Sequence, residues 1–134
     1  MNKKHLLAVL AYMLPTFPLA YLWHLTIFAG YYKSLHVYRE DIIIPFIILS
    51  MLVQGNIWAV IYRRLFSREP ILRGALRFAS LAAPLAWSFM ALAVCAKHPL
   101  TSPMSYLGIE TCFILVQYAI TSPLIAWVYR SKSA

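Results

Sequence analysis

The sequence predicts an all-α fold, a four-helix transmembrane bundle. Of its 134 residues 62% are hydrophobic and only 12% are charged, and the mean hydropathy is +0.70. A soluble domain carries about 25% charged residues. The chain also contains four apolar runs of about 20 residues, the length that crosses roughly 30 Å of hydrocarbon. We therefore expect residues 1–134 to form a single integral membrane domain.

The four spans follow one another with short connections. Pro15 and Pro18 lie inside the first span and predict a kink there, because neighbouring groups in a bundle satisfy the carbonyls that a proline frees. The third span is rich in alanine, and small residues let helix backbones approach closely in lipid. The expected spans are residues 6–30, 42–62, 76–96 and 106–129.

The distribution of charge predicts the orientation. The net charge is +8, but Lys and Arg cluster at the ends of the apolar runs, which favours topology and lipid headgroups over nucleic acid as the explanation. By the positive-inside rule we expect both termini in the cytoplasm. The predicted inner side carries Lys3, Lys4, Arg63, Arg64, Arg68, Arg73, Arg77, Arg130 and Lys132, and the outer side carries Lys33, Arg39 and Lys97.

A faint internal repeat favours a tandem duplication of a two-helix hairpin. PLAYLW at residues 18–23 is similar to PLAWSF at 84–89, and LVQ occurs at 52–54 and again at 115–117. A Trp and a Tyr-Arg pair follow each LVQ. Chance matches between apolar segments are the alternative explanation. Two helices per half would make the repeats parallel, related by an axis along the membrane normal.

Two ionisable residues lie inside the predicted spans at similar depth. Glu110 is about four residues from the outer end of the fourth span, and His24 is about six residues from the outer end of the first. At 1.5 Å per residue, both lie within roughly 6 to 9 Å of the same boundary. If the helices touch, the carboxylate can fix the tautomer of the imidazole, which would mark a functional site. The alternatives are a purely structural pair, or separate contacts with headgroups.

An aromatic and charged segment at residues 31–41 adjoins this pair and faces outward in the predicted topology. Arg39 is a second candidate partner for Glu110, or it pairs with Glu40 and Asp41, which would also suit a helix N-terminus. The resulting candidate ligand pocket consists of Trp23, His24, Tyr32, Arg39 and Glu110.

Other polar residues favour structural roles. Gln54, Asn56 and Gln117 lie near mid-membrane, where side-chain amides form hydrogen bonds between helices, and contact with a substrate is the alternative. Cys95 and Cys112 lie near the outer ends of adjacent helices. They are expected to be free cysteines, with a disulfide as the alternative in an oxidising compartment.

The sequence predicts no cofactor and no metal. His24 is the one histidine well inside a span, whereas haem between helices usually needs two. A metal site built from His24, His36, His98 and a cysteine has no supporting spacing. Phosphate-binding, dinucleotide-binding, zinc-protease and G-x-S-x-G motifs are missing from the sequence.

The segment WHLTIFAGYYKSLHVYREDIIIPFIILSMLVQG resembles small bacterial inner-membrane proteins of uncharacterised function. The similarity consists of a Trp-His near the end of the first helix, a Tyr-rich loop that ends in Tyr-Arg and an acid, and a Pro-Phe at the start of the second helix. It covers the first half of the chain. It implies four helices in the bacterial inner membrane and no assigned activity.

Three classes of function stay open. The first is a protein that binds or helps transport a small or lipidic ligand in the outward pocket, either alone or as a homo-oligomer. The second is a structural or accessory subunit of a larger membrane complex, docked through the alanine-rich third span. The third, less favoured, is a membrane enzyme with His24 and Glu110 as an acid-base pair. The lipid bilayer is the one partner that composition itself requires.

Overall fold

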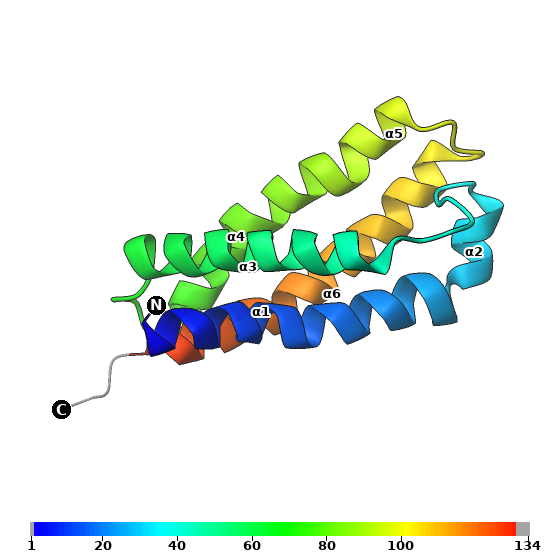
Figure 1. Cartoon of the computed structure of the whole chain (residues 1–134). Helices are drawn as coiled ribbons and strands as arrows, with labels where there is room; N and C mark the ends of the chain where they lie inside the picture. The colour runs from blue at the N-terminus through cyan, green and yellow to red at the C-terminus, as the bar shows by residue number, and fades with distance from the viewer. Residues whose placement is uncertain (1, 131–134) are drawn as a thin grey trace.

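A computed structural model describes residues 2–130, and it confirms the all-α four-helix bundle (Figure 1). Four helical stretches are long and apolar enough to cross a membrane, namely Lys3–Ile27, Ile44–Leu65, Ile71–Lys97 and Pro103–Tyr129. The first consists of α1 (Lys3–Leu22) and a π-helical turn η1 (Trp23–Ile27), followed by the short α2 (Ala29–Ser34). The remaining elements are α3 (Ile44–Leu65), α4 (Ile71–Trp87), the π-helical turn η2 (Ser88–Leu92), α5 (Ala93–Lys97) and α6 (Pro103–Tyr129).

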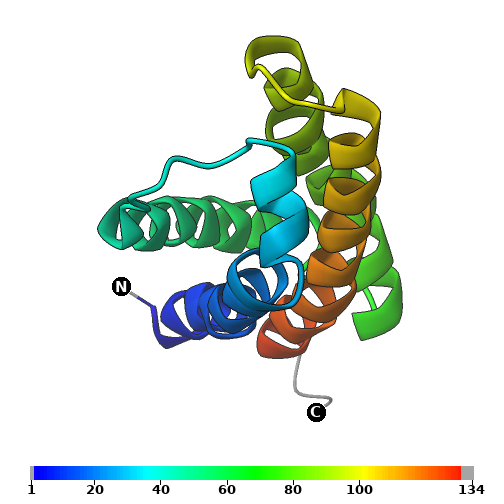
Figure 2. The ribbon, with the colours of Figure 1, turned by 90° about the vertical axis from the view of Figure 1, so that its right-hand side faces the viewer.

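The helices pack in the spatial order α3, α1, α6, α4. α1 packs on both α3 and α6, and α6 also packs on α4. α3 contacts α4 through Trp58 and Tyr62, which pack on Phe78, but it does not pack closely on η2 or α5. Figure 2 looks from the end that carries α2 and shows α3 at the left, apart from α5 at the top. The bundle is therefore closed on three sides and spread apart between α3 and α5.

Helix boundaries differ from the predicted ones where prolines and charges control them. The third helix begins at Ile71, directly after Pro70 and five residues earlier than expected, because proline fixes a backbone angle that suits a helix start. Arg73 and Arg77, expected near or at the edge of a loop, both bind Glu69 within this first part of the helix. α1 continues through Pro15 and Pro18, and its irregularity is the π-helical turn that begins at Trp23.

Both ends of the described chain lie at one end of the bundle, together with the connection between α3 and α4 (Figure 1). We call this the termini end, and the opposite end, which carries α2, the α2 end. Nζ of Lys4 donates to the carbonyl of Arg130 over 3.4 Å, which joins the first and last helices. The termini end carries Lys3, Lys4, Arg63, Arg64, Arg68, Arg73, Arg77 and Arg130, and the α2 end carries Lys33, Arg39 and Lys97.

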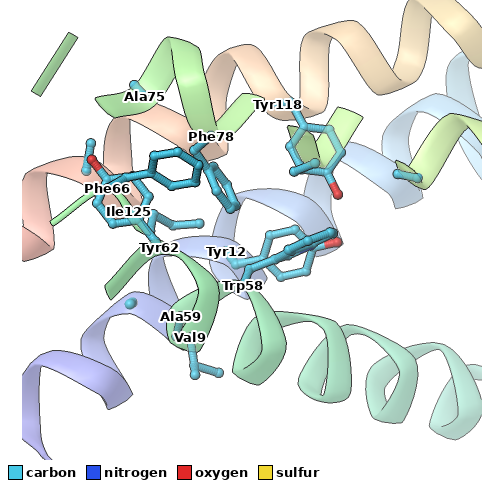
Figure 3. Close-up of a cluster of buried hydrophobic side chains, with 14 of the residues drawn as sticks. Val9, Tyr12, Trp58, Ala59, Tyr62, Phe66, Ala75, Phe78, Tyr118 and Ile125 are labelled. Carbon is cyan, nitrogen blue, oxygen red and sulfur yellow. The ribbon is translucent and has the colours of Figure 1, made fainter. Parts of the chain in front are cut away.

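Aromatic side chains fill the core toward the termini end (Figure 3). Trp58 of α3 packs edge-on against Phe78 of α4, with ring centroids 5.7 Å apart, and against Tyr118 of α6 at 6.2 Å. Edge-to-face aromatic pairs of this kind stabilise a core beyond the area that they bury. The alanine-rich face of α4 packs on α6, where Ala82 is fully buried.

Two glycines allow close approach in this core. A Cβ at Gly74 would lie 2.3 Å from the hydroxyl oxygen of Tyr62, and a Cβ at Gly55 would lie 3.3 Å from side-chain atoms of Val9 and Tyr12. Real Cβ atoms do not approach other heavy atoms to 2.3 Å. Gly74 is therefore required for α4 to pack over Tyr62, and Gly55 for α3 to pack tightly on α1.

The proposed repeat has structural counterparts in both halves. The segment after Pro18 enters a π-helical turn at Trp23, and the segment after Pro84 enters one at Ser88. The two Tyr-Arg tyrosines, Tyr62 and Tyr129, stack on each other with centroids 5.7 Å apart and rings 14° from parallel. These features occur at matching places in the two hairpins. The extensive packing of α1 on α6 has no equivalent between α4 and α3, so the bundle as a whole is not symmetric.

Two connections meet at the α2 end and hold each other in place. His36 adopts a left-handed backbone conformation with φ of 56°, and its Nδ1 lies 2.8 Å from the hydroxyl oxygen of Thr101. The backbone N–H of Thr101 also donates to the carbonyl of Leu35 over 3.3 Å. The segment after α2 is thus fastened to the connection between α5 and α6.

Candidate functional site

His24 lies within the π-helical turn η1, where the first membrane helix departs from α-helical geometry. Such turns are rare and frequently occur at functional sites. Nδ1 of His24 lies 3.0 Å from the backbone carbonyl of Ala20. Because a carbonyl only accepts, Nδ1 carries a hydrogen and donates it there. The second ring nitrogen, Nε2, is left to face the interior of the bundle.

Glu110 of α6 occupies that interior position and is only 2% exposed. Its Oε2 lies 3.3 Å from Nε2 of His24 and accepts a hydrogen bond from the hydroxyl of Tyr32 at 2.9 Å. The structure thus brings together the two ionisable residues that the sequence placed at matched depth. We call His24 and Glu110 the dyad.

The hydrogen bonds of the dyad fix its overall charge. Since the hydrogen on Nδ1 is committed to Ala20, the contact between Nε2 and Oε2 needs one further hydrogen. That hydrogen belongs either to an imidazolium facing a carboxylate or to a carboxyl group facing a neutral imidazole. In both forms the dyad is electrically neutral as a pair, which lowers the cost of burying it.

Tyr32 of α2 supports the dyad from the α2 end. It is completely buried, and its hydroxyl accepts a hydrogen bond from Nε1 of Trp23 at 3.2 Å while donating to Glu110. Burial, together with the nearby charge of Glu110, raises the pKa of Tyr32 above its ordinary value. The hydroxyl therefore keeps its hydrogen and remains a donor. Trp23 acts on the site through Tyr32.

Arg39 does not contact Glu110. It forms a bidentate pair with Asp41, in which Nε and Nη2 lie 3.0 and 3.2 Å from the two carboxylate oxygens, and its side chain is 60% exposed. Neither Glu40 nor Asp41 caps the second membrane helix, which begins at Ile44 with no side-chain cap. Pro45 lies in its first turn, where a residue without an N–H leaves fewer donors to cap.

A cavity of about 690 Å³ adjoins the dyad between α1, α3, α6 and the η2–α5 segment. His24, Arg39 and Glu110 line it, whereas Tyr32 and Trp23 lie behind the dyad. Its wall is otherwise largely apolar, with Ile47 and Met51 of α3 facing Met90 and Val94. The volume falls within the range of about 300–1,000 Å³ that is usual for ligand sites. Residues of both α3 and the η2–α5 segment line the cavity, and these are the elements that lie apart.

The deep end of the cavity is polar, and Tyr12 organises it. The hydroxyl of Tyr12 donates to Oε1 of Gln54 over 2.6 Å and accepts from Nε2 of Gln117 at 3.1 Å. Tyr12 thus joins α1, α3 and α6, and the two glutamines are linked through it. Sequence analysis did not single out Tyr12, although a hydroxyl at the same depth as two amides was the available signal.

Asn56 lies away from this cavity. Its Oδ1 lies 2.9 Å from Nε2 of His5, and its Nδ2 donates to the carbonyl of Leu52 over 2.8 Å. The contact joins the start of α1 to α3, which is a structural role.

Two other residues that were not predicted, Phe113 and Tyr38, pack on the imidazole of His24 with centroids 4.4 and 6.1 Å away.

Both cysteines are free. Cys95 is half-buried, with Sγ 3.4 Å from the carbonyl of Pro103, and Cys112 is exposed on α6. Within residues 2–130, no three His, Cys, Asp or Glu side chains come together as a metal site. The chemistry of the site therefore depends on the dyad and on the acceptors that surround the cavity.

This arrangement can hold an apolar molecule and satisfy a polar group on it. The dyad can also give or take a proton at the cavity wall, because its shared hydrogen lies between two groups of opposite function. Comparison of the chain with family models, with curated proteins and with solved structures finds no match.

Proposed function

We propose that this protein is a multi-pass membrane protein that binds a small lipid-soluble molecule in the cavity beside Glu110. One observation carries the proposal: a carboxylate that is 2% exposed lines a cavity of about 690 Å³ inside an otherwise apolar bundle. Ionisable residues in a membrane interior are costly, and they usually face a cavity or a functional partner.

The location that goes with this function is the bacterial inner membrane, with both termini in the cytoplasm. The support is the charge distribution, since eight basic residues of the described chain lie at the termini end and three at the α2 end. The cavity then lies in the outer half of the membrane. Its open side, between α3 and α5, faces the lipid, which is the route by which a lipid-soluble molecule would enter.

Native mass spectrometry of the gently solubilised protein tests the proposal. The wild type should carry a bound small molecule that is lost or strongly reduced in Glu110→Gln, a substitution that keeps the shape of the side chain. Glu69→Gln is the matched control, because Glu69 lies at the termini end, pairs with Arg73 and Arg77, and should keep the ligand. A wild type without any adduct, or adducts that are equal in all three proteins, would contradict the proposal.

The dyad favours one second candidate, a membrane enzyme that transfers a proton to or from the bound molecule. The supporting observation is the 3.3 Å contact between Nε2 of His24 and Oε2 of Glu110 at the cavity wall. Once the ligand is identified by mass, incubation with purified protein should convert it in a pH-dependent manner. Unchanged ligand at every pH would reject the enzyme and leave the binding function standing.

An accessory subunit that docks through the third span has less support. Among the alanines of the third span that suggested such a surface, Ala82, Ala86 and Ala91 are buried, and α4 packs on α6. The same mass spectra report on this alternative, because a homo-oligomer or a tightly associated partner would appear as a larger complex.

A further inference from the structure

The cavity presents hydrogen-bond acceptors that the protein itself does not satisfy. Both contacts of Glu110 use Oε2, so its Oε1 has no hydrogen bond within the described chain. Oε1 of Gln117 is buried, in a residue that is 3% exposed, and likewise has no partner among residues 2–130. Both residues line the cavity. Buried polar groups are normally paired, so the unpaired oxygen of Glu110, a cavity-lining residue that is only 2% exposed, indicates a missing donor at this wall.

The network at the deep end identifies the free atom of Gln117 as its oxygen. The hydroxyl hydrogen of Tyr12 is donated to Gln54, so the same hydroxyl must accept from Gln117. The amide nitrogen of Gln117 therefore points to Tyr12, and the carbonyl oxygen is the atom left unpaired. Seven residues along α6 place it about 10 Å deeper than Glu110.

Charge narrows the class of donor further. An anion such as a carboxylate or phosphate would place its acceptors beside the unpaired oxygen of Glu110, and the guanidinium of Arg39, which also lines the cavity, is already paired with Asp41. An ammonium group would add a net positive charge next to a dyad that is neutral as a pair. In a medium of low dielectric constant both charged classes are disfavoured.

We propose that the molecule bound here is a neutral, lipid-soluble alcohol or phenol whose hydroxyl donates to Oε1 of Glu110. This inference rests on the proposed binding function and specifies its ligand. The apolar body of the molecule lies between Met90 and Ile47, and it reaches the cavity from the lipid through the open side between α3 and α5.

Four probes with one apolar body and different head groups test the hydroxyl: farnesol, farnesyl methyl ether, farnesylamine and farnesoic acid. Dissociation constants are measured in lipid nanodiscs for the wild type and for Glu110→Gln. Farnesol should bind the wild type roughly ten- to a hundred-fold more tightly than the methyl ether, since the ether leaves Oε1 of Glu110 unpaired. The amine and the acid should bind as weakly as the ether.

Each probe partitions into lipid to the same extent with the wild type and with Glu110→Gln. Comparing the dissociation constants of the two proteins therefore cancels the contribution of partitioning. The amide offers both a donor and an acceptor, so the preference for farnesol over the ether should shrink at least about fivefold in the variant. Glu69→Gln should keep the wild-type preference. Thermal unfolding of both variants reports whether the fold is retained.

Other outcomes overturn the inference and separate it from the proposed function. If the ether, the amine or the acid binds as tightly as farnesol, the site binds a ligand but does not select a hydroxyl donor. If no probe binds while a small molecule co-purifies in native mass spectra, the ligand belongs to another class and only the inference fails. If no probe binds and nothing co-purifies, the proposed function fails as well.

Discussion

Nε2 of His24 lies 3.3 Å from Oε2 of Glu110, although 86 positions separate the two residues in the chain. Because Nδ1 of the same ring donates to the carbonyl of Ala20, the two groups share one hydrogen and are neutral as a pair. A neutral pair can remain buried between membrane helices and still give the adjoining cavity its polar wall.

A double-mutant cycle tests the coupling within the dyad. His24→Ala alone should lower the free energy of unfolding by about 3–5 kcal/mol, because it leaves the carboxylate of Glu110 buried without its partner. Adding Glu110→Gln should recover much of that loss, since the amide carries no charge. Chemical denaturation of the three variants in detergent provides the free energies. Strictly additive effects would show that the two side chains do not act as a pair.

Tyr12→Phe removes the hydroxyl that links Gln54 and Gln117 while keeping the aromatic ring. Hydrogen bonds between membrane helices contribute about 0.6 kcal/mol on average and at most about 1.7 kcal/mol, so the loss of two should cost about 1–3 kcal/mol. Tyr21→Phe is the control, because Tyr21 lies on the same helix and is 50% exposed. Equal stability of the two variants would mean that the bridge contributes nothing.

Gly74→Ala should destabilise the packing of α4 over α3. The new Cβ would lie 2.3 Å from the hydroxyl oxygen of Tyr62, and crowding in a well-packed core costs about 1–3 kcal/mol. Gly108→Ala is the matched control, because a Cβ there meets nothing within 4 Å. Replacing a glycine within a helix by alanine lowers the conformational entropy of the unfolded chain, so the control should be more stable by about 0.5–1 kcal/mol. Thermal unfolding distinguishes the opposite signs, and a stabilised Gly74→Ala would contradict the packing.

Met90→Trp should fill part of the cavity without touching the dyad. Met90 is half-buried and lines the cavity from η2, whereas the neighbouring Leu92 is 43% exposed and does not line it. We expect Met90→Trp to weaken ligand binding roughly tenfold or more, and Leu92→Trp to leave it unchanged. Retention of the native adduct in both variants, measured by mass spectrometry, would place the ligand elsewhere.

The sequence predicts the bundle well because the membrane imposes strong rules. Apolar runs of sufficient length mark the spans, and each run has its helix in the structure. The exception in detail is the third helix, which begins at Ile71 directly after Pro70 and includes Arg73 and Arg77, whose charges are paired by contact with Glu69. That contact joins side chains across a turn, so hydropathy alone does not reveal it.

The sequence predicts a contact within the site only where two residues lie at the same depth in the membrane on adjacent helices. His24 and Glu110 lie at the same level of adjacent helices, so depth alone suggested their contact. Arg39 lies in the connection after α2, where the sequence offers it several carboxylates, and Asp41, two residues away, is the one that binds it. Tyr12 was not predicted because a tyrosine in a span resembles one more aromatic core residue. The role of Tyr12 depends on which face of α1 points toward α3 and α6. The spacing of residues in the sequence does not reveal that orientation.

The most direct test of the central claim is a crystal structure of the protein grown in a lipidic mesophase, after purification with its native lipids. The account predicts continuous density for an apolar molecule in the cavity, with a polar atom within hydrogen-bond distance of Oε1 of Glu110. A cavity closed by movement of α3 against α5, or an occupant that makes no contact with Glu110, would contradict it.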